Sequence, residues 1–307
     1  MASLALRRLF TAVPTLFIII TAAFFMMRAA PGGPFDSERA LLPEIEANIK
    51  AAYDLDKPLV DQYFIYLKRV VRGDFGPSYK FKDFTVNELI ATGFPTSLKL
   101  GGAAIILALA LGVSLGTAAA LRQNSLTDHV VMTAAMTGIA VPNFVMAPLM
   151  ALIFGIYLKL LPVAGWEEGT IKDMVLPVIA LTLPYTAYIA RLTRGSMIEV
   201  LHTNYVRTAR AKGLPERRII IRHALPAAIL PVVSFLGPAT AGIITGSVVI
   251  EQIFQVPGIG RYFVQGALNR DYTLVMGVVI FYAALIMLFN LIVDLVYAFL
   301  DPRVRYK

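Results

Sequence analysis

The feature that most limits the fold of this chain is a series of long segments without a charged side chain. Uncharged apolar runs of about 18 or more residues predict membrane-spanning helices, because roughly 20 helical residues cross the hydrocarbon core. Six segments reach or approach this length: Leu9–Met27, Leu100–Leu121, Val130–Leu158, Met174–Ala190, Ala224–Ile250 and Tyr272–Val293, the last continuing past Asp294 to Leu300. With a mean hydropathy of +0.69, too little polar surface remains to cover six such helices in water. We therefore predict an all-α integral membrane protein with six transmembrane helices.

The positive charges are distributed unevenly between the loops. The net charge is +8 at pH 7, but alternation of Lys and Arg between loops is typical of membrane topology rather than of nucleic-acid binding. If the N-terminus is inside, 14 of the 28 Lys and Arg lie in cytoplasmic segments, four lie in short outer loops, and ten lie between Arg28 and Lys99. We predict a multi-pass protein with both termini cytoplasmic and no nucleic-acid partner.

The first apolar run also has the position of a signal peptide, since it follows Arg7 and Arg8. It is longer than a typical signal core, however, and Pro31 directly after Ala29 and Ala30 disfavours cleavage there. An uncleaved anchor is the prediction. The chain has no cysteine, which excludes disulfides, thiolate metal sites and cysteine nucleophiles.

Residues 31–97 form a polar segment between the first two apolar runs and are predicted to be extracytoplasmic. Leu41, Ile45, Ile49 and Tyr53 recur every four residues, a spacing that predicts an amphipathic helix. A second helix is expected in the stretch VDQYFIYLKRVVRGDFGPS, ended by Gly73 and then by Gly76-Pro77. The segment is too short to form an independent domain with a large core.

Gly112-Val113-Ser114-Leu115-Gly116 matches the G-x-S-x-G pattern of serine hydrolases, so an intramembrane serine protease is one alternative function. That motif needs a strand-to-helix turn, whereas this stretch lies inside an uninterrupted apolar run. The same glycine spacing, which recurs in Gly242–Gly246, permits close contact between membrane helices. Helix packing is therefore the predicted role.

The chain contains no G-x-x-x-x-G-K-[ST] loop and no H-E-x-x-H spacing, so neither a nucleotide nor a metal ion is expected to bind by those motifs. A secondary transporter is a second alternative, but such proteins place ionisable residues mid-membrane for ion coupling. Asp294, near the cytoplasmic third of the last run, is the one clear candidate. If the protein does energised work, the energy source is expected to be a partner.

Residues 191–226 form the longest predicted cytoplasmic loop, and the part from Arg191 to Arg222 carries eight of the 28 Lys and Arg. Helical periodicity places Tyr205, Val206 and Ala209 on one side, with Arg207 and Arg210 on the neighbouring face. Gly213 is typical of a helix end and Pro215 of the first turn of a new helix. Positive charge alone fits contact with anionic membrane lipid. Two helices joined by Gly-Leu-Pro favour instead a rigid element that projects a small apolar knob into a cytoplasmic partner.

The loop sequence YVRTARAKGL…IIIRHALPAAILPVV resembles the cytoplasmic motif of ABC-importer permeases, E-A-A-x(3)-G-x(9)-I-x-L-P. The chain keeps Ala209, Gly213, Leu225 and Pro226 of this motif. It departs from it at Arg207, Thr208 and His223, where the motif has Glu, Ala and Ile. The RTARAKG form is similar to the peptide and nickel permease branch of the family. Since Arg207 replaces the motif glutamate, it would need an acidic or carbonyl partner.

Further stretches extend the resemblance to essentially the whole chain and make it similar to the B-type membrane subunit of bacterial oligopeptide permeases. They are RRLFTAVPTLFIIITAAFFMMRAAPGGPF, GDFGPSYKFKDFTVNELI, LTRGSMIEVLHTNYVRTARAKGLPERR, EQIFQVPGIGRYFVQGALNRDY and DLVYAFLDPRVRY. The resemblance implies the type I importer fold in one permease domain spanning residues 1–307, located in the bacterial inner membrane.

The partners implied by the resemblance are a homologous C-type permease, two ATPase subunits that use ATP and Mg, and an extracytoplasmic peptide-binding protein. No cofactor is expected on this chain itself, which would not be an enzyme. The family's coupling helix, which docks in an ATPase cleft, corresponds here to ten consecutive residues: Tyr205, Val206, Arg207, Thr208, Ala209, Arg210, Ala211, Lys212, Gly213 and Leu214. Closure of the ATPases would move the two permeases between inward and outward openings.

The substrate is expected to be an oligopeptide imported from the periplasm, with dipeptides, murein peptides and nickel as alternatives within the family. Candidate residues of the translocation path are polar positions in the apolar runs: Asn143, Thr240, Thr245, Ser247, Asn290 and Asp294. Hydrogen bonding between helices is the competing role for these side chains.

Overall fold

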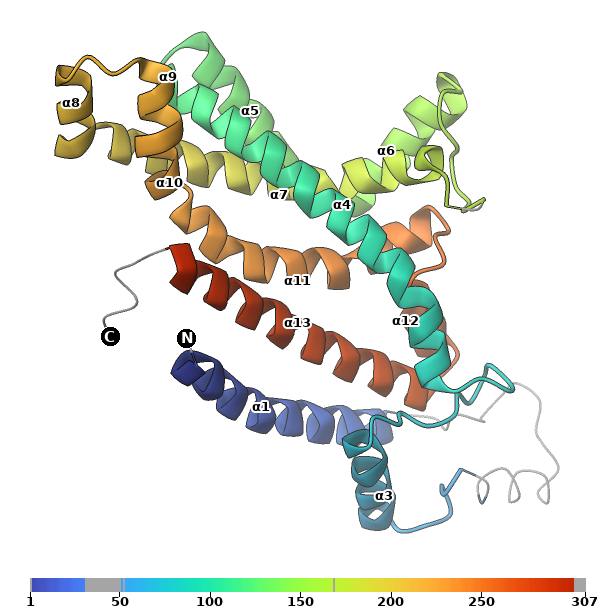
Figure 1. Cartoon of the computed structure of the whole chain (residues 1–307). Helices are drawn as coiled ribbons and strands as arrows, with labels where there is room; N and C mark the ends of the chain where they lie inside the picture. Colours follow the sequence, from blue (N-terminus) through green and yellow to red (C-terminus); the bar gives the residue numbers. More distant parts are fainter. Residues whose placement is uncertain (1, 31–50, 52, 168, 301–307) are drawn as a thin grey trace. The chain divides into compact units, whose positions relative to one another are not determined.

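The described elements of the chain are helices, and several have the length of a membrane span. The computed structural model describes residues 2–30, 51, 53–167 and 169–300 (Figure 1). Five helices are long and apolar enough to cross a membrane. They are α1 (Ala2–Ala29), α4 (Val86–Leu121), α7 (Ile171–Leu201), α11 (Leu230–Ile253) and α13 (Tyr272–Leu300). The prediction of an all-α membrane fold is confirmed.

The third of the six predicted spans, Val130–Leu158, is broken. It is made of α5 (Leu126–Ala140), followed by α6 (Asn143–Met150) and the π-helical turn η1 (Ala151–Tyr157), and the two halves meet at 103°. Val141 at the break is extended, with φ −89° and ψ 117°, because a residue before proline avoids the helical region. Pro142 itself lacks the N–H that would continue the helix. Figure 1 shows α6 leaving the direction of α5 at this point.

The described residues form two compact units. The first contains residues 98–256 and the end of α13 from residue 288. Its central element is α7, which contacts α5, α6, α8, η2, α10 and α11. Leu176, Leu181, Ile189 and Met197 of α7 are almost completely buried, so this helix supplies much of the core of the unit.

Close packing of α4 on α7 explains the glycines of the GVSLG stretch. A Cβ atom on Gly116 would lie 2.4 Å from the carbonyl oxygen of Ala190, and one on Gly112 would lie 2.6 Å from the side chain of Ile189. Both distances are too short for any larger residue without a backbone shift. Ser114 lies between the two glycines but is exposed, and α4 is continuous through it. The helix-packing role predicted for this stretch is therefore confirmed.

The second unit combines parts of Leu6–Ser97 with Pro257–Met287. It contains most of α1, α3 (Leu59–Val71), the start of α4, α12 (Ile259–Leu268) and the start of α13. Its core includes Phe24, Tyr66, Tyr272 and Met276. The predicted second helix of the polar segment is confirmed as α3, and Gly73 and Gly76 after it have φ values of 77° and 89°. The helix predicted from Leu41, Ile45, Ile49 and Tyr53 lies largely outside the described residues.

Asp271, directly before α13, fixes a loop of the polar segment onto this second unit. Its buried carboxylate accepts a hydrogen bond from the Ser78 hydroxyl. It accepts two more, both at 3.1 Å, from the N–H groups of Tyr79 and Lys80. It also caps the helix by accepting from the Leu274 N–H at 3.1 Å. Hydrogen bonds to an ionised group are stronger than neutral ones, so this one carboxylate stabilises both the loop and the helix start.

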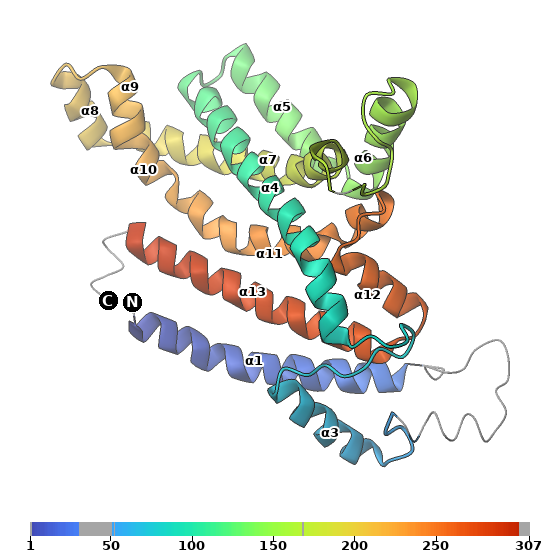
Figure 2. The same cartoon turned by 45° about the vertical axis from the view of Figure 1, so that its right-hand side comes forward.

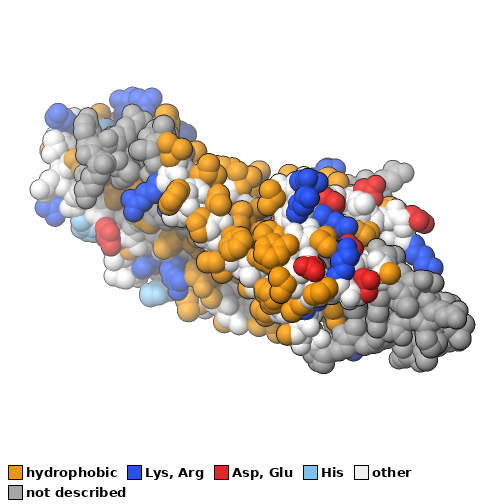
Figure 3. Space-filling view, turned by 90° about the horizontal axis from the view of Figure 1, so that it is seen from below, with side chains coloured by type: hydrophobic (Ala, Val, Ile, Leu, Met, Phe, Trp, Pro, Cys, Tyr) orange, Lys and Arg blue, Asp and Glu red, His pale blue; other side chains and the backbone are white. Residues whose placement is uncertain are grey.

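Large apolar side chains remain uncovered by the rest of the chain. On α1, Phe10 is 81% exposed and Val13 is 62% exposed. Figure 3 shows one face of the molecule on which hydrophobic side chains are abundant at the surface. Such surfaces are expected where lipid or other membrane subunits surround a helix.

Candidate functional site

The cytoplasmic loop predicted from residues 191–226 contains two helical segments joined by a tight turn. The first is α8 (Asn204–Ala211), which ends where Gly213 takes a φ of +74°, a left-handed conformation that favours glycine. After the turn the chain continues through α9 (Glu216–Arg218), the π-helical turn η2 (Ile219–Ala224) and α10 (Leu225–Ala228). Figures 1 and 2 show α8 and α9 side by side beyond the end of α7. The predicted helix–turn–helix is confirmed.

The apolar side of α8 faces the protein, contrary to the predicted apolar knob. Val206 is fully buried and Ala209 is 6% exposed. They pack with Met197, Leu201 and Ile219 of the same unit. The knob prediction was wrong because the periodicity that marks an apolar face does not tell whether the covering surface belongs to the same chain.

The outward face of α8 and the turn is polar and basic. Its exposed residues are Asn204, Tyr205, Arg207, Thr208, Arg210, Ala211, Lys212 and Gly213, and the Leu214 side chain is partly buried against the core. Tyr205, at 47% exposure, is the one large aromatic side chain on this face. An aromatic ring among arginines is a composition enriched at protein interfaces.

An ion pair closes the turn between α8 and α9. Arg210 Nη2 lies 2.6 Å from Glu216 Oε1, and both side chains are about half exposed. The hydrogen bond from Arg210 lowers the pKa of Glu216 and raises that of Arg210. The sequence placed Glu216 at a helix start but did not reveal this pair, because a separation of six residues across a turn follows no helical spacing.

A second ion pair lies where α5 begins. Asp128 accepts hydrogen bonds from Arg194 Nε at 2.5 Å and Arg194 Nη2 at 2.7 Å, and its side chain is only 2% exposed. It also accepts from the Asn124 N–H at 2.9 Å. The pair joins the start of α5 to α7, ten residues before α8 begins. The sequence does not reveal this pair, because Ser125-x-x-Asp128 indicates a helix start but does not identify a partner 66 residues away.

A cavity of about 420 Å³ opens at the break between α5 and α6. Asn143, one of the predicted path residues, lines it together with side chains of α7 and α11. It is the only predicted path residue among the lining residues in the part of the chain that the structure describes.

The other predicted path residues are dispersed. Thr240 is partly buried, and the Thr245 hydroxyl donates to the Ala241 carbonyl at 2.8 Å. Ser247 is fully buried and its hydroxyl bonds Glu251 at 2.6 Å, so it does not line an opening here and its geometry fits packing within the unit. Asn290 lies against Gly237, and Asp294 follows it on α13, half-buried. For all six residues, a role in the path stays a prediction.

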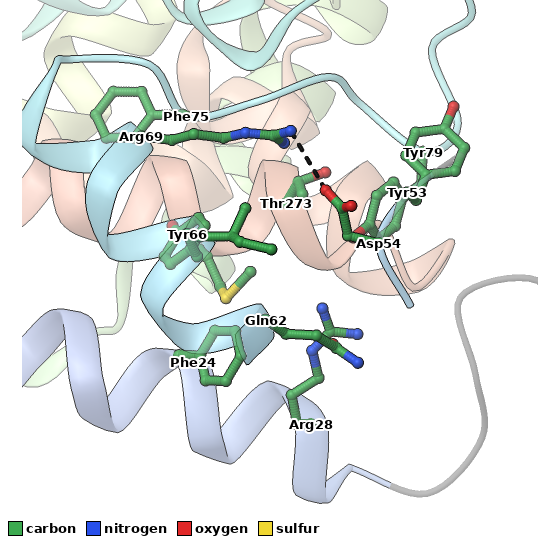
Figure 4. A pocket seen from close by; sticks show the side chains of 12 residues that line it. Phe24, Arg28, Tyr53, Asp54, Gln62, Tyr66, Arg69, Phe75, Tyr79 and Thr273 are labelled. Atoms are coloured by element: carbon green, nitrogen blue, oxygen red, sulfur yellow. Dashed lines mark hydrogen bonds and ion pairs between the residues drawn. The ribbon is translucent and has the colours of Figure 1, made fainter. Parts of the chain in front are cut away.

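A smaller polar cavity lies in the second unit, between the end of α1 and α3 (Figure 4). Its volume is about 40 Å³, enough for a few water molecules. Arg28 Nε, Gln62 Oε1 and Tyr66 Oη are buried there without a protein partner. In Figure 4 the Arg28 side chain extends towards Gln62, and Arg69 pairs with Asp54 at 3.4 Å. A site of this size with mixed donors and acceptors suits ordered water rather than a peptide.

Among the described residues, no group of three or more His, Asp or Glu side chains is placed to hold a metal ion. His129, His202 and His223 belong to separate elements, α5, the end of α7 and η2. The arrangement around Ser114 lacks the strand-to-helix turn that a nucleophilic serine requires.

Comparison with known families and proteins agrees with this geometry. Residues 112–306 match the family described as "Binding-protein-dependent transport system inner membrane component", and residues 1–101 match its N-terminal component. The chain is 60% identical over 306 residues to the "Oligopeptide transport system permease protein OppB" of Salmonella typhimurium, covering 100% of both chains. It is 57% identical over 300 residues to the protein of the same name from Haemophilus influenzae, covering 98% of both.

More distant matches are also to transport proteins. The "Dipeptide transport system permease protein DppB" of Bacillus subtilis is 44% identical over 305 residues, with 99% of this chain and 98% of the relative covered. Among solved structures, a chain of the inward-facing MetNI methionine ABC transporter superposes with a TM-score of 0.57 at 16% identity. That match covers 69% of this chain and 96% of the other, and it shows that the fold is one found in an ABC transporter.

Proposed function

Because the chain belongs to the family of binding-protein-dependent transport system inner membrane components, we propose that it is the B-type permease subunit of an ATP-driven importer of oligopeptides. The observation that carries the substrate class is full-length identity of 60% to an oligopeptide permease, against 44% to a dipeptide permease. The relatives are transport permeases, and the alternatives of a secondary transporter or an intramembrane serine protease receive no support from them.

The cytoplasmic loop is the proposed site of coupling to an ATPase subunit. Residues Tyr205 to Leu214 form α8 and its turn, with Val206 and Ala209 anchoring the helix from inside. The exposed Tyr205, Arg207 and Arg210 supply the outward contact surface. Because the apolar anchor continues into α7 through Met197 and Leu201, a push on α8 would be transmitted to a membrane-spanning helix.

The proposed assembly contains a homologous C-type permease, two ATPase subunits and an extracytoplasmic peptide-binding protein. ATP and Mg would be used by the ATPase subunits, since this chain carries no nucleotide-binding loop. The excess of Lys and Arg in the loops of one side supports an orientation with both termini in the cytoplasm of a bacterium and residues 31–97 outside. In this proposal the two compact units work together as one permease domain.

Uptake by the assembled transporter tests the proposal. Cells that express this chain together with the partner subunits of the proposed assembly should accumulate labelled tri- to pentapeptides, and omission of the chain should abolish this uptake. Accumulation of dipeptides, murein peptides or nickel instead would reassign the substrate. Failure of the chain to co-purify with ATPase subunits would contradict the assignment to an ATP-driven importer.

The coupling role has its own test. Gly213→Pro, or Arg207→Glu combined with Arg210→Glu, should abolish peptide uptake and peptide-stimulated ATP hydrolysis while leaving membrane insertion unchanged. Proline cannot adopt the φ of +74° at Gly213, and the double charge reversal inverts the outward face. A matched control is Arg217→Glu with Arg218→Glu, which reverses two exposed charges on α9, outside the proposed contact. Normal coupled uptake in the Gly213 or α8 variants would rule out the assignment.

A further inference from the structure

The cavity at the α5–α6 break lies where the membrane normally forbids irregular backbone. Pro142 has no N–H, so the Gly138 carbonyl loses its usual helical donor, and the last carbonyls of α5 have none either. Non-helical backbone at membrane depth is tolerated only where it is buried in protein or lines a water-filled space. Tyr185, which also lines the cavity, is near the middle of the 31-residue α7. Pro142 lies inside the apolar run 130–158 and Tyr185 inside the run 174–190, so the cavity is lined by residues of two predicted spans.

The walls of this cavity are aromatic, with a few polar groups. Tyr188 of α7 stacks on Phe235 of α11, with ring centroids 5.7 Å apart and planes at 30°. The Tyr185 hydroxyl lies against Gly242, where a Cβ would be 2.8 Å away, so the glycine makes room for this ring on α11. Asn143 adds an amide that can both donate and accept hydrogen bonds.

A cation continues the aromatic wall towards the basic loop. The exposed Arg191 guanidinium lies 5.1 Å from the centroid of the Tyr188 ring, one turn further along α7. No carboxylate within ion-pair distance of Arg191 is found among the residues that the structure describes. The surface thus runs from an amide, over tyrosine and phenylalanine rings, to a positive charge.

We propose that this cavity is a contact site for the imported peptide during its passage. The peptide would be contacted by Asn143, Tyr185, Tyr188 and Phe235, and Arg191 would attract its C-terminal carboxylate. The inference rests on the proposed function, because the ligand is the imported peptide. Aromatic faces and one amide contact main chain and side chains of many kinds without selecting a sequence. A cation beside the rings favours peptides with a free carboxylate over amidated ones.

A second cavity in the same unit has a different lining. A groove of about 570 Å³ between α4, α5 and α7 is lined by aliphatic side chains and glycine, with Thr182 and Thr186 as its only polar residues. Such a lining is compatible with lipid tails. Tyrosine hydroxyls, an asparagine and broken backbone are costly against hydrocarbon, so the cavity at the break is the one of the two suited to water and peptide.

Thiol labelling tests the proposal directly, since the chain has no cysteine of its own. Tyr188→Cys and Asn143→Cys are introduced singly into the transporter assembled with cysteine-free partner subunits. A charged methanethiosulfonate reagent should modify both positions, and saturating tri-alanine during ATP turnover should slow the modification at least threefold. Leu115→Cys, in the aliphatic groove, is the matched control and should resist the charged reagent.

Two results would overturn the proposal. Resistance of both introduced thiols to the reagent would mean that lipid or another subunit covers the cavity. Modification that tri-alanine does not slow would mean that the cavity is wet but lies outside the path. Uptake of tri-alanine by the unsubstituted transporter is measured in parallel, so that failure of the oligopeptide assignment is distinguished from failure of this site.

Transport kinetics give a second test. Tyr188→Ala should raise the KM for tri-alanine uptake about 3- to 10-fold, the effect expected for loss of an aromatic contact, whereas Tyr188→Phe should remain near normal. Arg191→Gln should lower uptake of tri-alanine more than uptake of its C-terminal amide. The control Tyr157→Ala removes the same side chain from a position 74% exposed and away from the cavity, and should change neither value. Equal changes in KM for Tyr188→Ala and Tyr157→Ala would contradict the proposal that the cavity contacts the peptide.

Discussion

Two arginine–carboxylate pairs lie in or near the basic loop of residues 191–226, and they differ in burial and in sequence separation. Asp128 and Arg194 join two membrane helices across 66 residues of sequence, with side-chain exposures of 2% and 26%. Arg210 and Glu216 close a turn of six residues, with exposures of 43% and 51%. The distances are nearly equal, at 2.5 Å and 2.6 Å, so distance alone does not distinguish them.

Burial decides what each pair contributes. An exposed ion pair is worth only about 0–1 kcal/mol, because water and salt solvate the separated charges nearly as well. Removing one partner of a buried pair costs about 3–5 kcal/mol, since the remaining charge is left without solvent. The Asp128–Arg194 pair therefore fixes the start of α5 to α7, whereas the Arg210–Glu216 pair can open at little cost. In the proposed importer, the loop would exchange its partner on docking while the helices beneath it stay joined.

The largest effect is expected from breaking the buried pair. Asp128→Ala should lower the free energy of unfolding of the full-length chain in mild detergent by about 1.5–3 kcal/mol, because Arg194 loses both charged hydrogen bonds but, at 26% exposure, remains partly solvated. SDS titration followed by circular dichroism measures this value. Glu199→Ala, which removes an exposed carboxylate from α7, the helix that carries Arg194, is the control and should cost less than about 0.5 kcal/mol. Equal losses of unfolding free energy in the two variants would show that the Asp128–Arg194 pair contributes no more than an exposed carboxylate.

A smaller effect is expected at the turn that the exposed pair closes. Gly213→Ala should destabilise the chain by about 1–2 kcal/mol because its φ is +74°, although a Cβ would meet no atom within 4 Å. Gly195→Ala is the matched control: its Cβ would also meet nothing within 4 Å, but the position is helical, so the change should stabilise by about 0.5–1 kcal/mol. The same titration measures both. If Gly213→Ala instead raised the free energy of unfolding, the ion pair rather than the glycine would determine the conformation of the turn.

The smallest effect is expected from the exposed pair itself. Glu216→Gln should change the free energy of unfolding by less than about 1 kcal/mol. Because Arg210 lowers the pKa of Glu216 in the folded chain, this contribution is complete above the ordinary value of 4.5 and is lost as pH falls through the lower folded pKa. Unfolding of the two chains measured from pH 7 down to pH 3 should therefore converge at the acid end. If the difference in unfolding free energy between the two chains widened on acidification, the Arg210–Glu216 pair would not be its source.

Local sequence patterns predicted the elements around these pairs well. Gly213 and Pro215 marked the turn because their backbone conformations depend on their own covalent structure. The break in the third span was not predicted, although Pro142 explains it afterwards, because a proline restricts the residue before it and has no N–H of its own. The π-helical turn that ends directly before Leu225 and Pro226 was not expected, because several local hydrogen-bond patterns are compatible with that sequence.

Local sequence patterns did not predict which side of a helix is covered by other parts of the protein. Val206 and Ala209 were assigned to an outward knob, yet they are covered by Met197, Leu201 and Ile219. Asp128 was overlooked, although it is among the few buried charged residues described. Of the predicted path residues, Asn143 lines the cavity at the break, whereas Ser247 faces inward to Glu251. In each case the partner lies on another element, or another turn, that periodicity does not identify.

The sequence by itself determined that this chain crosses a membrane repeatedly and that a basic loop with two helical segments separates two of the apolar runs. These properties follow from hydropathy, proline and glycine, and they act over a few residues at a time. The tertiary structure alone decided the 103° break, the pairing of Asp128 with Arg194, and the meeting of Tyr188 with Phe235. These depend on contacts between residues distant in sequence, whose energies exist only after the helices have packed.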